Sequence, residues 1–225
     1  MSQNKPKAIV SWSSGKDSAM ALYKVLRSNQ FQVIAMLTTV SDPFQRVSMH
    51  GVREELLDRQ AASIGIPIEK IRIPYPCPNE VYEQKMSERM VSYKSSGLTH
   101  AIFGDLFLED IRKYREEKLS QFGIIPIFPL WREDTSRLAR TILGLGFKAV
   151  ITCVDPKKLD VKFAGRHFDA DFLNEIPLTV DPCGENGEFH TFVYDGPIFK
   201  RSIEIVVGDC VMRDGFQFAD VLLRE

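Results

Sequence analysis

The sequence has little cysteine and no long apolar run. Its four cysteines stand far apart at positions 77, 153, 183 and 210, with no C-x-x-C pair of the kind used for zinc binding or thiol exchange. No stretch approaches the roughly 20 apolar residues of a membrane span, and the first residues, MSQNKPKAIVSWSSGKDS, lack the apolar run of a signal peptide. These absences predict a cytoplasmic protein in a reducing compartment, without a membrane partner.

An excess of positive charge is also missing. The 225 residues include 29 Lys and Arg against 30 Asp and Glu, a net charge of -1, and no basic block stands out. This balance disfavours a nucleic-acid partner, which would need a phosphate-neutralising surface, but it allows a small anionic ligand. With 44% hydrophobic and 26% charged residues, the chain has the composition of a globular protein of one main domain with an elaboration.

Apolar runs alternate with segments of helical spacing over the first two thirds of the chain. The runs predict six strands, near residues 8–10, 33–39, 68–73, 101–103, 124–128 and 149–154. Because the strands are too apolar to be half exposed, the fold class is α/β, a doubly wound and mainly parallel sheet covered by helices. After about residue 155, Gly- and Pro-punctuated segments predict short strands joined by turns. We therefore expect a main domain over residues 1–155 and a smaller α+β subdomain over 156–225.

The segment SWSSGKDS, residues 11–18, carries the strongest chemical signal. It lies between the first strand and the first helix, where small residues let the backbone approach a ligand and the helix N-terminus stabilises phosphate oxygens. Lys16 adds positive charge, and Asp17 is a candidate Mg²⁺ ligand. A serine-rich helix cap is the alternative interpretation. The segment is not a Walker A loop, because Asp17 follows the Gly15-Lys16 pair where Ser or Thr is required.

The segment resembles the pyrophosphate loop, Ser-Gly-Gly-x-Asp-Ser, of the N-type ATP pyrophosphatases, with Ser14 in place of the first glycine. A serine keeps a phosphate-facing turn if its φ is negative, which is the conformation we expect for Ser14. The resemblance implies a Rossmann-like fold and binding of ATP with Mg²⁺. Its loop residues imply a nucleotide site made of Ser11, Ser13, Ser14, Gly15, Lys16, Asp17 and Ser18.

Three further segments narrow the resemblance to the diphthine-ammonia ligase family. They are HGVR at 50–53, GDLFLEDIR at 104–112 and DPCGENGEFHT at 181–191, and together they cover nearly the whole chain. In that family, ATP adenylates a carboxylate on a modified histidine of translation elongation factor 2, and ammonia then displaces AMP to form an amide. The ligases proper read more like Gly-Ala-Ile-x-Ser-Asp-Tyr-Gln-Arg in the middle segment, so a relative that acts on another carboxylate fits as well.

Other nucleotide contacts follow from position and chemistry. The end of the second strand, with Met36, Leu37 and Thr38, resembles the segment that holds adenine, since doubly wound sheets bind ligands beyond the carboxyl ends of their strands. His50 and Arg53 precede the next helix, where they are candidates to reach the triphosphate or, alternatively, a surface cap.

Acidic and C-terminal residues are the candidates for chemistry on the acceptor. Gly104 and Asp105 begin the middle segment. Its carboxylates Asp105, Glu109 and Asp110 are candidates to bind Mg²⁺ or to orient ammonium; the alternative interpretation is that they complement the helix dipole. Arg112 is a candidate for binding the acceptor carboxylate. The C-terminal segment adds the polar cluster Cys183, Gly184, Glu185, Asn186, Gly187, Glu188 and His190. As catalytic residues we predict Lys16, Asp17, Asp110, Glu185 and Glu188.

Several alternatives stay open at this point. Cys183 is either a nucleophile with His190 as its base or a small buried residue; a zinc site with Cys210 lacks the usual spacing. The rival functions are an ATP or AMP sensor without ligase activity and a pyrophosphatase that acts on a small molecule or on tRNA. The sequence leaves the acceptor and the oligomeric state open, a homo-oligomer included.

Overall fold

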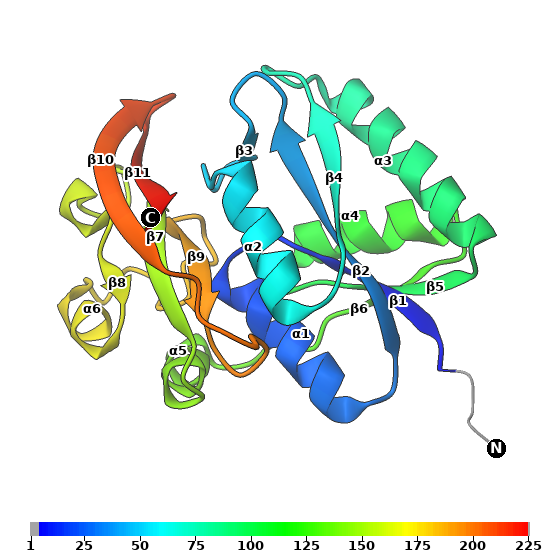
Figure 1. Ribbon diagram of the computed structural model, residues 1–225, viewed down its shortest axis with the longest axis horizontal. Coiled ribbons are helices and arrows are strands. Elements are labelled where there is room, and N and C mark those ends of the chain that lie inside the picture. Colours follow the sequence, from blue (N-terminus) through cyan, green and yellow to red (C-terminus); the bar gives the residue numbers. More distant parts are fainter. Residues whose placement is uncertain (1–4, 225) are drawn as a thin grey trace.

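The computed structural model describes residues 5–224 and contains two sheets with a helical layer around the first (Figure 1). The elements of the first part are β1 (Lys7–Ser11), α1 (Lys16–Ser28), β2 (Gln32–Ser41), β3 (Arg46–Val47), α2 (Glu54–Ile64), β4 (Ile68–Ile73), α3 (Asn79–Ser95), β5 (Leu98–Ile102), α4 (Glu109–Ser120) and β6 (Ile125–Ile127). Each strand is followed by a helix or loop as the apolar periodicity predicts.

The first sheet, sheet A, is parallel in the order β4-β2-β1-β5-β6, and the short β3 pairs antiparallel with the end of β2. Its two faces bury different residues. Val10 packs in a core with α1 and α2, whereas Ile9 packs in a second core that includes Met90 of α3 and Leu119 of α4. The middle residues of β1, 8–10, are buried on both faces and are apolar, which is typical of a central parallel strand. The α/β fold class with a mainly parallel sheet is confirmed.

The predicted sixth strand does not belong to this sheet. It is β7 (Lys148–Val154), which pairs antiparallel with three strands of sheet B: β8 (His167–Phe168), β9 (Phe189–Asp195) and β11 (Phe216–Leu223). The edge strand β10 (Ile205–Arg213) pairs with β11. The run is apolar because β7 lies in the centre of sheet B, and burial on both sides gives the same sequence pattern in a parallel or an antiparallel sheet. The expectation that this strand completes the parallel sheet is wrong.

Sheet B and sheet A share one core. Trp12 and Val10 from the first part pack in the same cluster as Ile151 of β7 and Phe192 of β9. The remaining helices are α5 (Thr135–Gly144), the 3-10 turn η1 (Val161–Phe163) and α6 (Ala170–Glu175). Sheet A ends with β6 and sheet B begins with β7, so α5 connects the two sheets. The predicted boundary between the two domains, near residue 155, stays a prediction. In residues 5–224, no helix is long and apolar enough to cross a membrane.

Candidate functional site

The serine loop, residues 11–18, runs from the end of β1 into α1 and is held by its neighbours. Ser14 has a φ of 70°, in the left-handed region, so the negative φ expected for it is wrong. Its carbonyl accepts hydrogen bonds from the Val193 N–H (2.9 Å) and the Gln60 side-chain amide (3.1 Å). The loop therefore needs the left-handed conformation that glycine supplies in the pyrophosphatase loop, and Ser14 adopts it because two donors fix its carbonyl.

The first turn of α1 offers its donors to the outside of the helix. The helix N-cap is Gly15, which has no side chain to accept a hydrogen bond, and the Lys16 N–H is bound by the Thr191 hydroxyl at 3.1 Å. The Ser18 hydroxyl donates to the Gly15 carbonyl at 2.9 Å and lies 3.1 Å from the Ser13 hydroxyl. A Cβ on Gly15 would lie 3.0 Å from the Thr191 carbonyl oxygen, so β9 can approach only a glycine.

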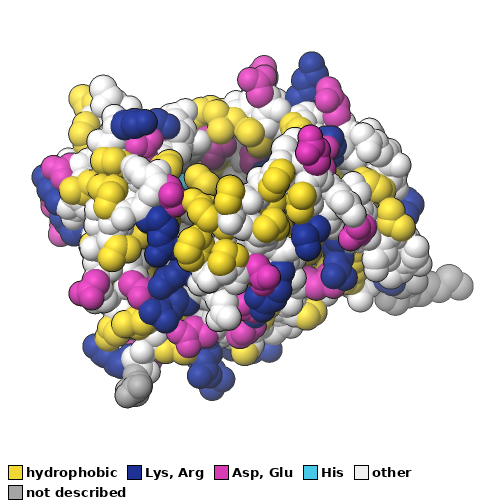
Figure 2. Space-filling view, turned by 90° about the horizontal axis from the view of Figure 1, so that it is seen from above, with side chains coloured by type: hydrophobic (Ala, Val, Ile, Leu, Met, Phe, Trp, Pro, Cys, Tyr) yellow, Lys and Arg dark blue, Asp and Glu magenta, His cyan; other side chains and the backbone are white. Residues whose placement is uncertain are grey.

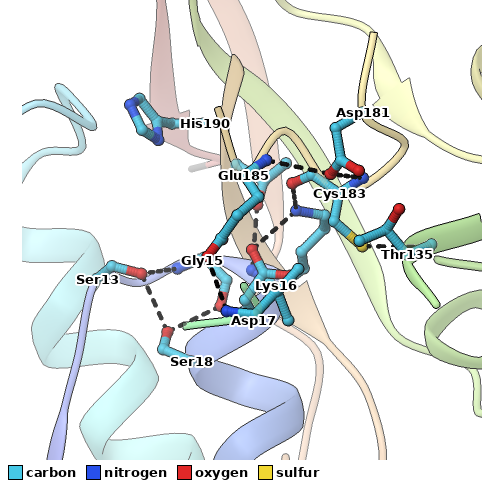
Figure 3. Close-up of polar contacts among 12 residues, drawn as sticks. Ser13, Gly15, Lys16, Asp17, Ser18, Thr135, Asp181, Cys183, Glu185 and His190 are labelled. Atoms are coloured by element: carbon cyan, nitrogen blue, oxygen red, sulfur yellow. Dashed lines mark hydrogen bonds and ion pairs between the residues drawn. The ribbon is translucent and has the colours of Figure 1, made fainter. Parts of the chain in front are cut away.

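The Lys16 side chain points into the protein rather than toward the outer side of the loop (Figure 3). It is only 2% exposed, and its ammonium binds the Asp17 carboxylate at 2.9 Å and the carbonyl of Cys183. The rings of Phe168 and Phe189 lie 5.4 and 5.2 Å from the Nζ atom. Burial disfavours the charged ammonium, but the adjacent Asp17 carboxylate outweighs it and raises the pKa of Lys16. Lys16 thus links the serine loop to the C-terminal loop, which we define as residues 181–188.

Glu185 extends from the C-terminal loop toward the serine loop (Figure 3). Its Oε1 atom accepts the Leu106 N–H at 2.7 Å. Burial raises the pKa of Glu185 to about 7, with smaller contributions from the negative charges of Asp17 and Asp105. A carboxyl group with a pKa near neutrality can donate or accept a proton under ordinary conditions.

Gly104 seats the middle segment against the first turn of α1. A Cβ on Gly104 would lie 2.8 and 2.9 Å from the carbonyl carbon and oxygen of Asp17, and 2.9 Å from the Ser18 backbone nitrogen. These are backbone atoms, which cannot rotate away from a Cβ at such short distances. The glycine therefore allows β5 and its following loop to pack directly under the N-terminus of α1.

The C-terminal loop is organised by its own carboxylates. The Asp181 Oδ1 atom accepts the backbone N–H groups of Cys183 (2.9 Å) and Glu185 (3.2 Å). Glu188 is 3% exposed, and its Oε1 accepts the Asp181 N–H (3.1 Å) and the Asn186 side-chain amide (3.0 Å). Glu188 and Asn186 therefore hold the loop in shape. Gly184 and Gly187 take positive φ values of 70° and 80° in the same turn.

Cys183 has the properties of a buried structural residue. Its side chain is 1% exposed and its thiol donates to the Thr135 carbonyl at 3.4 Å. Burial raises the pKa of Cys183 far above its usual range, which suppresses the thiolate that a nucleophile requires. The His190 imidazole lies apart from this thiol in Figure 3. The structure favours the buried alternative over the nucleophile.

A cavity of about 680 Å³ opens beside the serine loop. Ser11, Ser13, Leu37 and Thr38 line one end, and residues of α3 and α4 line the other. Its volume lies within the range of small-molecule sites in proteins. The side chain of Met36 lies in the core on the opposite face of sheet A, because successive residues of β2 point to opposite sides, so the predicted contact with adenine is one that the backbone of this segment would make.

Two histidines meet at the polar end of this cavity. The rings of His50 and His190 lie 4.3 Å apart, and the His50 Nδ1 atom is 3.4 Å from the Thr191 carbonyl oxygen. Burial lowers the pKa of His190 to about 4 and that of His50 well below its usual value. Both imidazoles are therefore neutral at physiological pH, next to the loop that begins α1.

Figure 2 shows the molecule from above, where hydrophobic side chains gather across the middle of the face and charges of both signs are interspersed around them. The loops at the top of Figure 1 contribute Phe44 and Tyr75, whose rings lie 5.0 Å apart and are 38% and 48% exposed. The interspersed positive and negative side chains of this face agree with the net charge of -1 of the chain.

Three predicted residues do not reach the serine loop. The Arg53 guanidinium instead binds Asp220 of β11, at 2.6 and 2.9 Å. Arg112 binds Glu116 at 2.7 Å and lies over the ring of Trp131 at 4.6 Å. Asp110 is exposed on α4. Sequence spacing placed these residues beside the motifs but could not say which way each side chain turns.

The acidic cluster of the middle segment is dispersed. Asp105 pairs with Arg115 at 2.8 Å and Glu109 with Arg132 at 3.1 Å. Within residues 5–224, no group of three or more His, Cys, Asp or Glu side chains could hold a metal ion by itself. For Mg²⁺, which in nucleotide sites takes only one or two carboxylates along with phosphates and water, Asp17 does fit: its Oδ1 atom is buried and has no hydrogen-bond partner in the described chain.

Gln60 and Thr191 were missed as site residues. Gln60 is fully buried on α2, accepts the Trp12 indole N–H at 2.8 Å, and donates to the carbonyls of Ser14 and Val193. The available signal was an uncharged polar residue of large size on the mainly apolar face of α2. Thr191 ends the DPCGENGEFHT segment, but nothing in the sequence shows that its hydroxyl caps α1.

The fold and the site define a class of protein: an α/β protein with a serine- and glycine-containing loop at the carboxyl edge of a parallel sheet, where folds of this kind bind ligands. The chain belongs to the diphthamide synthase family. The model of the Diphthamide synthase N-terminal domain matches residues 6–124, and that of the Diphthamide synthase C-terminal domain matches residues 134–219.

Curated relatives agree with this family. The chain is 23% identical to the diphthine--ammonia ligase of Mus musculus and 24% identical to that of Homo sapiens, in each case over 93% of this chain and 86% of the relative. Among solved structures, a predicted subunit of tRNA methyltransferase from Methanocaldococcus jannaschii matches with a TM-score of 0.41 and 14% identity, over 65% of this chain and 80% of that one. The resemblance to the diphthine-ammonia ligase family is confirmed.

Proposed function

We propose that this protein is an ATP-dependent, AMP-forming ligase that activates a carboxylate and converts it to an amide with ammonia. The observation that carries the proposal is the meeting of two loops at the N-terminus of α1. There the serine loop ends in Asp17, whose Oδ1 atom is unpartnered, and the C-terminal loop brings in Glu185, a carboxyl group with a pKa of about 7.

The serine loop would bind the triphosphate. The N-terminus of a helix stabilises phosphate oxygens through its backbone N–H groups and its dipole, and the small residues of the loop allow close approach. The adenine would lie in the cavity near Leu37 and Thr38, which line it beyond the carboxyl end of β2. The neutral His190 is positioned to donate a hydrogen bond to the ligand at this end of the cavity, whereas the Nδ1–H of His50 donates to the Thr191 carbonyl and leaves its Nε2 atom as an acceptor.

Mg²⁺ would be held by Asp17 together with the phosphates. When bound, the ion would neutralise charge on the leaving pyrophosphate. Lys16, whose ammonium binds Asp17 at 2.9 Å from the inner side, would keep the carboxylate oriented outward. We therefore assign Lys16 to positioning rather than to phosphate contact.

The proposed reaction has two steps. A carboxylate oxygen of the acceptor attacks the α phosphorus of ATP, the bond from that phosphorus to the bridging oxygen breaks, and pyrophosphate leaves. The nitrogen of ammonia then attacks the carbonyl carbon of the acyl adenylate, and the carbon–oxygen bond to AMP breaks. Glu185 is the residue we assign to accept the proton that the attacking nitrogen loses, because its pKa of about 7 suits proton transfer.

The acceptor we propose is the carboxylate of diphthine on elongation factor 2, because the curated relatives are diphthine--ammonia ligases. A different acceptor stays as the second candidate. It is favoured by the middle segment, in which Leu108 to Ile111 stand where the ligases proper carry Ser-Asp-Tyr-Gln, and in which Arg112 is occupied by Glu116.

The test incubates the protein with ATP, Mg²⁺, ammonium and elongation factor 2 purified from cells that accumulate diphthine. We expect AMP, pyrophosphate and the amide in equal amounts, and Asp17→Ala should abolish all three. Asp171→Ala, an exposed acidic residue of α6, is the matched control and should retain full turnover. Tight ATP binding without turnover would instead favour a nucleotide sensor, and AMP formation only with another carboxylate would favour the second acceptor.

A further inference from the structure

The β10 strand forms a free edge of sheet B. It pairs with β11 on one side, and no other backbone group of residues 5–224 is hydrogen-bonded to Val206–Arg213. Figure 1 shows the β10–β11 hairpin at the outer side of the molecule. Val211 and Met212 are 45% and 55% exposed. A long β-branched edge strand is a template for a further strand unless it is covered or charged.

The hairpin is held in place by its tip. The Arg213 guanidinium lies over the Phe44 ring at 4.6 Å, and the Tyr75 hydroxyl donates to the Asp214 carboxylate at about 2.5 Å. The loops that carry Phe44 and Tyr75 belong to sheet A, so the edge is fixed relative to the rest of the protein. An ordered edge loses little conformational freedom when it pairs.

A β-bulge limits the part of the edge that can pair. In the ladder with β11, Val207 faces Val221 and Cys210 faces Ala219, so two residues of β10 oppose one of β11 between these pairs. Val207 and Cys210 both lie toward Gly165, which places Asp209, Val211 and Arg213 on the other face by alternation. The regular ladder with β11 therefore covers residues 210–213, and Asp209 is the bulge residue next to it.

Charge within this stretch is self-complementary. In the described chain, neither Asp209 nor Arg213 has an ion-pair partner, although both are charged and lie on one face of the same strand. If a second copy pairs antiparallel about a two-fold axis through Val211, Asp209 of each copy faces Arg213 of the other. Val211 then faces its own copy, and Cys210 faces Met212. A shift by one or two residues removes both ion pairs, so the charges select this register.

We propose that this chain forms a two-fold symmetric dimer in which the β10 strands pair antiparallel at residues 209–213 and join the two copies of sheet B into one continuous sheet. The occupant of the edge is a second copy because a two-fold contact must present one patch to itself, and this patch carries both members of its ion pair. The area of a short strand contact is small, so the dimer is reversible and depends on concentration.

Cysteine cross-linking tests the axis directly. In a background in which Cys77 and Cys210 are serine, Val211→Cys places two thiols opposite each other, at the Cα separation of about 4.5–5.5 Å that a disulfide accepts. Mild oxidation should yield a covalent dimer. Val206→Cys is the matched control: it has similar exposure, 36% against 45%, but lies roughly 30 Å from its own copy in this register and should stay monomeric. Equal cross-linking of both variants, or none, would overturn the proposal.

A charge exchange tests the register independently of oxidation. Sedimentation velocity between about 10 μM and 1 mM should show a monomer–dimer equilibrium for the natural chain. Asp209→Arg places two arginines opposite each other twice per dimer and should weaken association by about tenfold or more, while the double variant Asp209→Arg with Arg213→Asp should restore it. A monomer at every concentration, or a double variant as weak as the single one, would refute the pairing. Ligase turnover plays no part in either readout.

Discussion

Replacement of Ser14 by glycine should stabilise the protein, although the substitution removes a side chain from a fully buried position. Ser14 combines two unfavourable features. Its φ of 70° is costly for any residue with a Cβ, and its Oγ atom is buried without a hydrogen-bond partner in the described chain. Glycine removes both features and leaves the Ser14 carbonyl, which receives the bonds from Val193 and Gln60, in place.

The size of the effect follows from three contributions. The left-handed conformation costs roughly 1–2 kcal/mol for a residue that carries a Cβ. The unsatisfied hydroxyl costs about 1–3 kcal/mol. Against these, glycine gives the unfolded chain more freedom, at a cost of roughly 0.5–1 kcal/mol. We expect a net gain of about 1–4 kcal/mol, which for a chain of this length raises Tm by roughly 2–16 °C.

Urea unfolding followed by circular dichroism measures the difference, and Ser14→Ala separates the two contributions. Alanine keeps the Cβ and its strain but removes the hydroxyl, so it should gain less than glycine does. Ser13→Gly is the control in the same loop, since Ser13 is not among the residues with positive φ and its hydroxyl lies 3.1 Å from that of Ser18; it should destabilise. A Ser14→Gly variant less stable than the natural chain would refute the argument, because it would mean that the hydroxyl has a partner or that the loop has another conformation.

Three further predictions follow from the site. Gly104→Ala should lower the free energy of unfolding by about 1–3 kcal/mol and weaken ATP binding in calorimetry, because its Cβ would lie 2.8 Å from the Asp17 backbone; unchanged affinity would contradict the packing of the middle segment under α1. The pKa of Glu185, about 7 in the folded protein, exceeds its unfolded value, so its contribution to stability is present at low pH and is lost between about pH 4.5 and 7, whereas amide formation should rise through pH 7 as the carboxylate forms. Because the lowered pKa values of His50 and His190 make stability rise with pH over part of this range, the Glu185 contribution is measured as the difference in stability between the natural chain and Glu185→Gln. That difference should fall from about pH 4.5 to 7, and a constant difference would argue against the raised pKa. Native-state alkylation with iodoacetamide should modify the exposed Cys210 and leave Cys183 unmodified, as mass spectrometry of peptides can show, and Cys183→Ala should keep ligase turnover; rapid labelling of Cys183 would restore it as a nucleophile candidate.

Sheet A was predictable because its pattern is local. Apolar runs such as residues 8–10 and 101–103, each followed by a turn and a helical repeat, define a strand–helix alternation with few alternatives. The position of β7 was not predictable, because burial on both faces produces the same apolar run whether the neighbouring strands run parallel or antiparallel. Only the pairing with β9 and β11, which lie 35 or more residues further along the chain, decides the sheet to which it belongs.

The candidate site divides in the same way. The serine loop was predictable from residue types, since small residues between a strand and a helix have one common use. The directions in which the side chains of the site point were not predictable. Lys16 turns inward because the carbonyl of Cys183 and the Asp17 carboxylate solvate its ammonium, and Arg53 turns to Asp220, which is 167 positions away. Cys183 and Asp220 lie far along the chain, in the C-terminal loop and in β11, and no spacing within a motif encodes such partners.

The most direct test of the central claim follows the oxygen atoms of the acceptor. If the carboxylate is activated by adenylation, one of its oxygens must leave with AMP when ammonia forms the amide. With an acceptor whose carboxylate is labelled with ¹⁸O, mass spectrometry should find one labelled oxygen in AMP for each amide formed and none in pyrophosphate. Label in inorganic phosphate together with ADP, or amide formation with unlabelled AMP, would contradict the account.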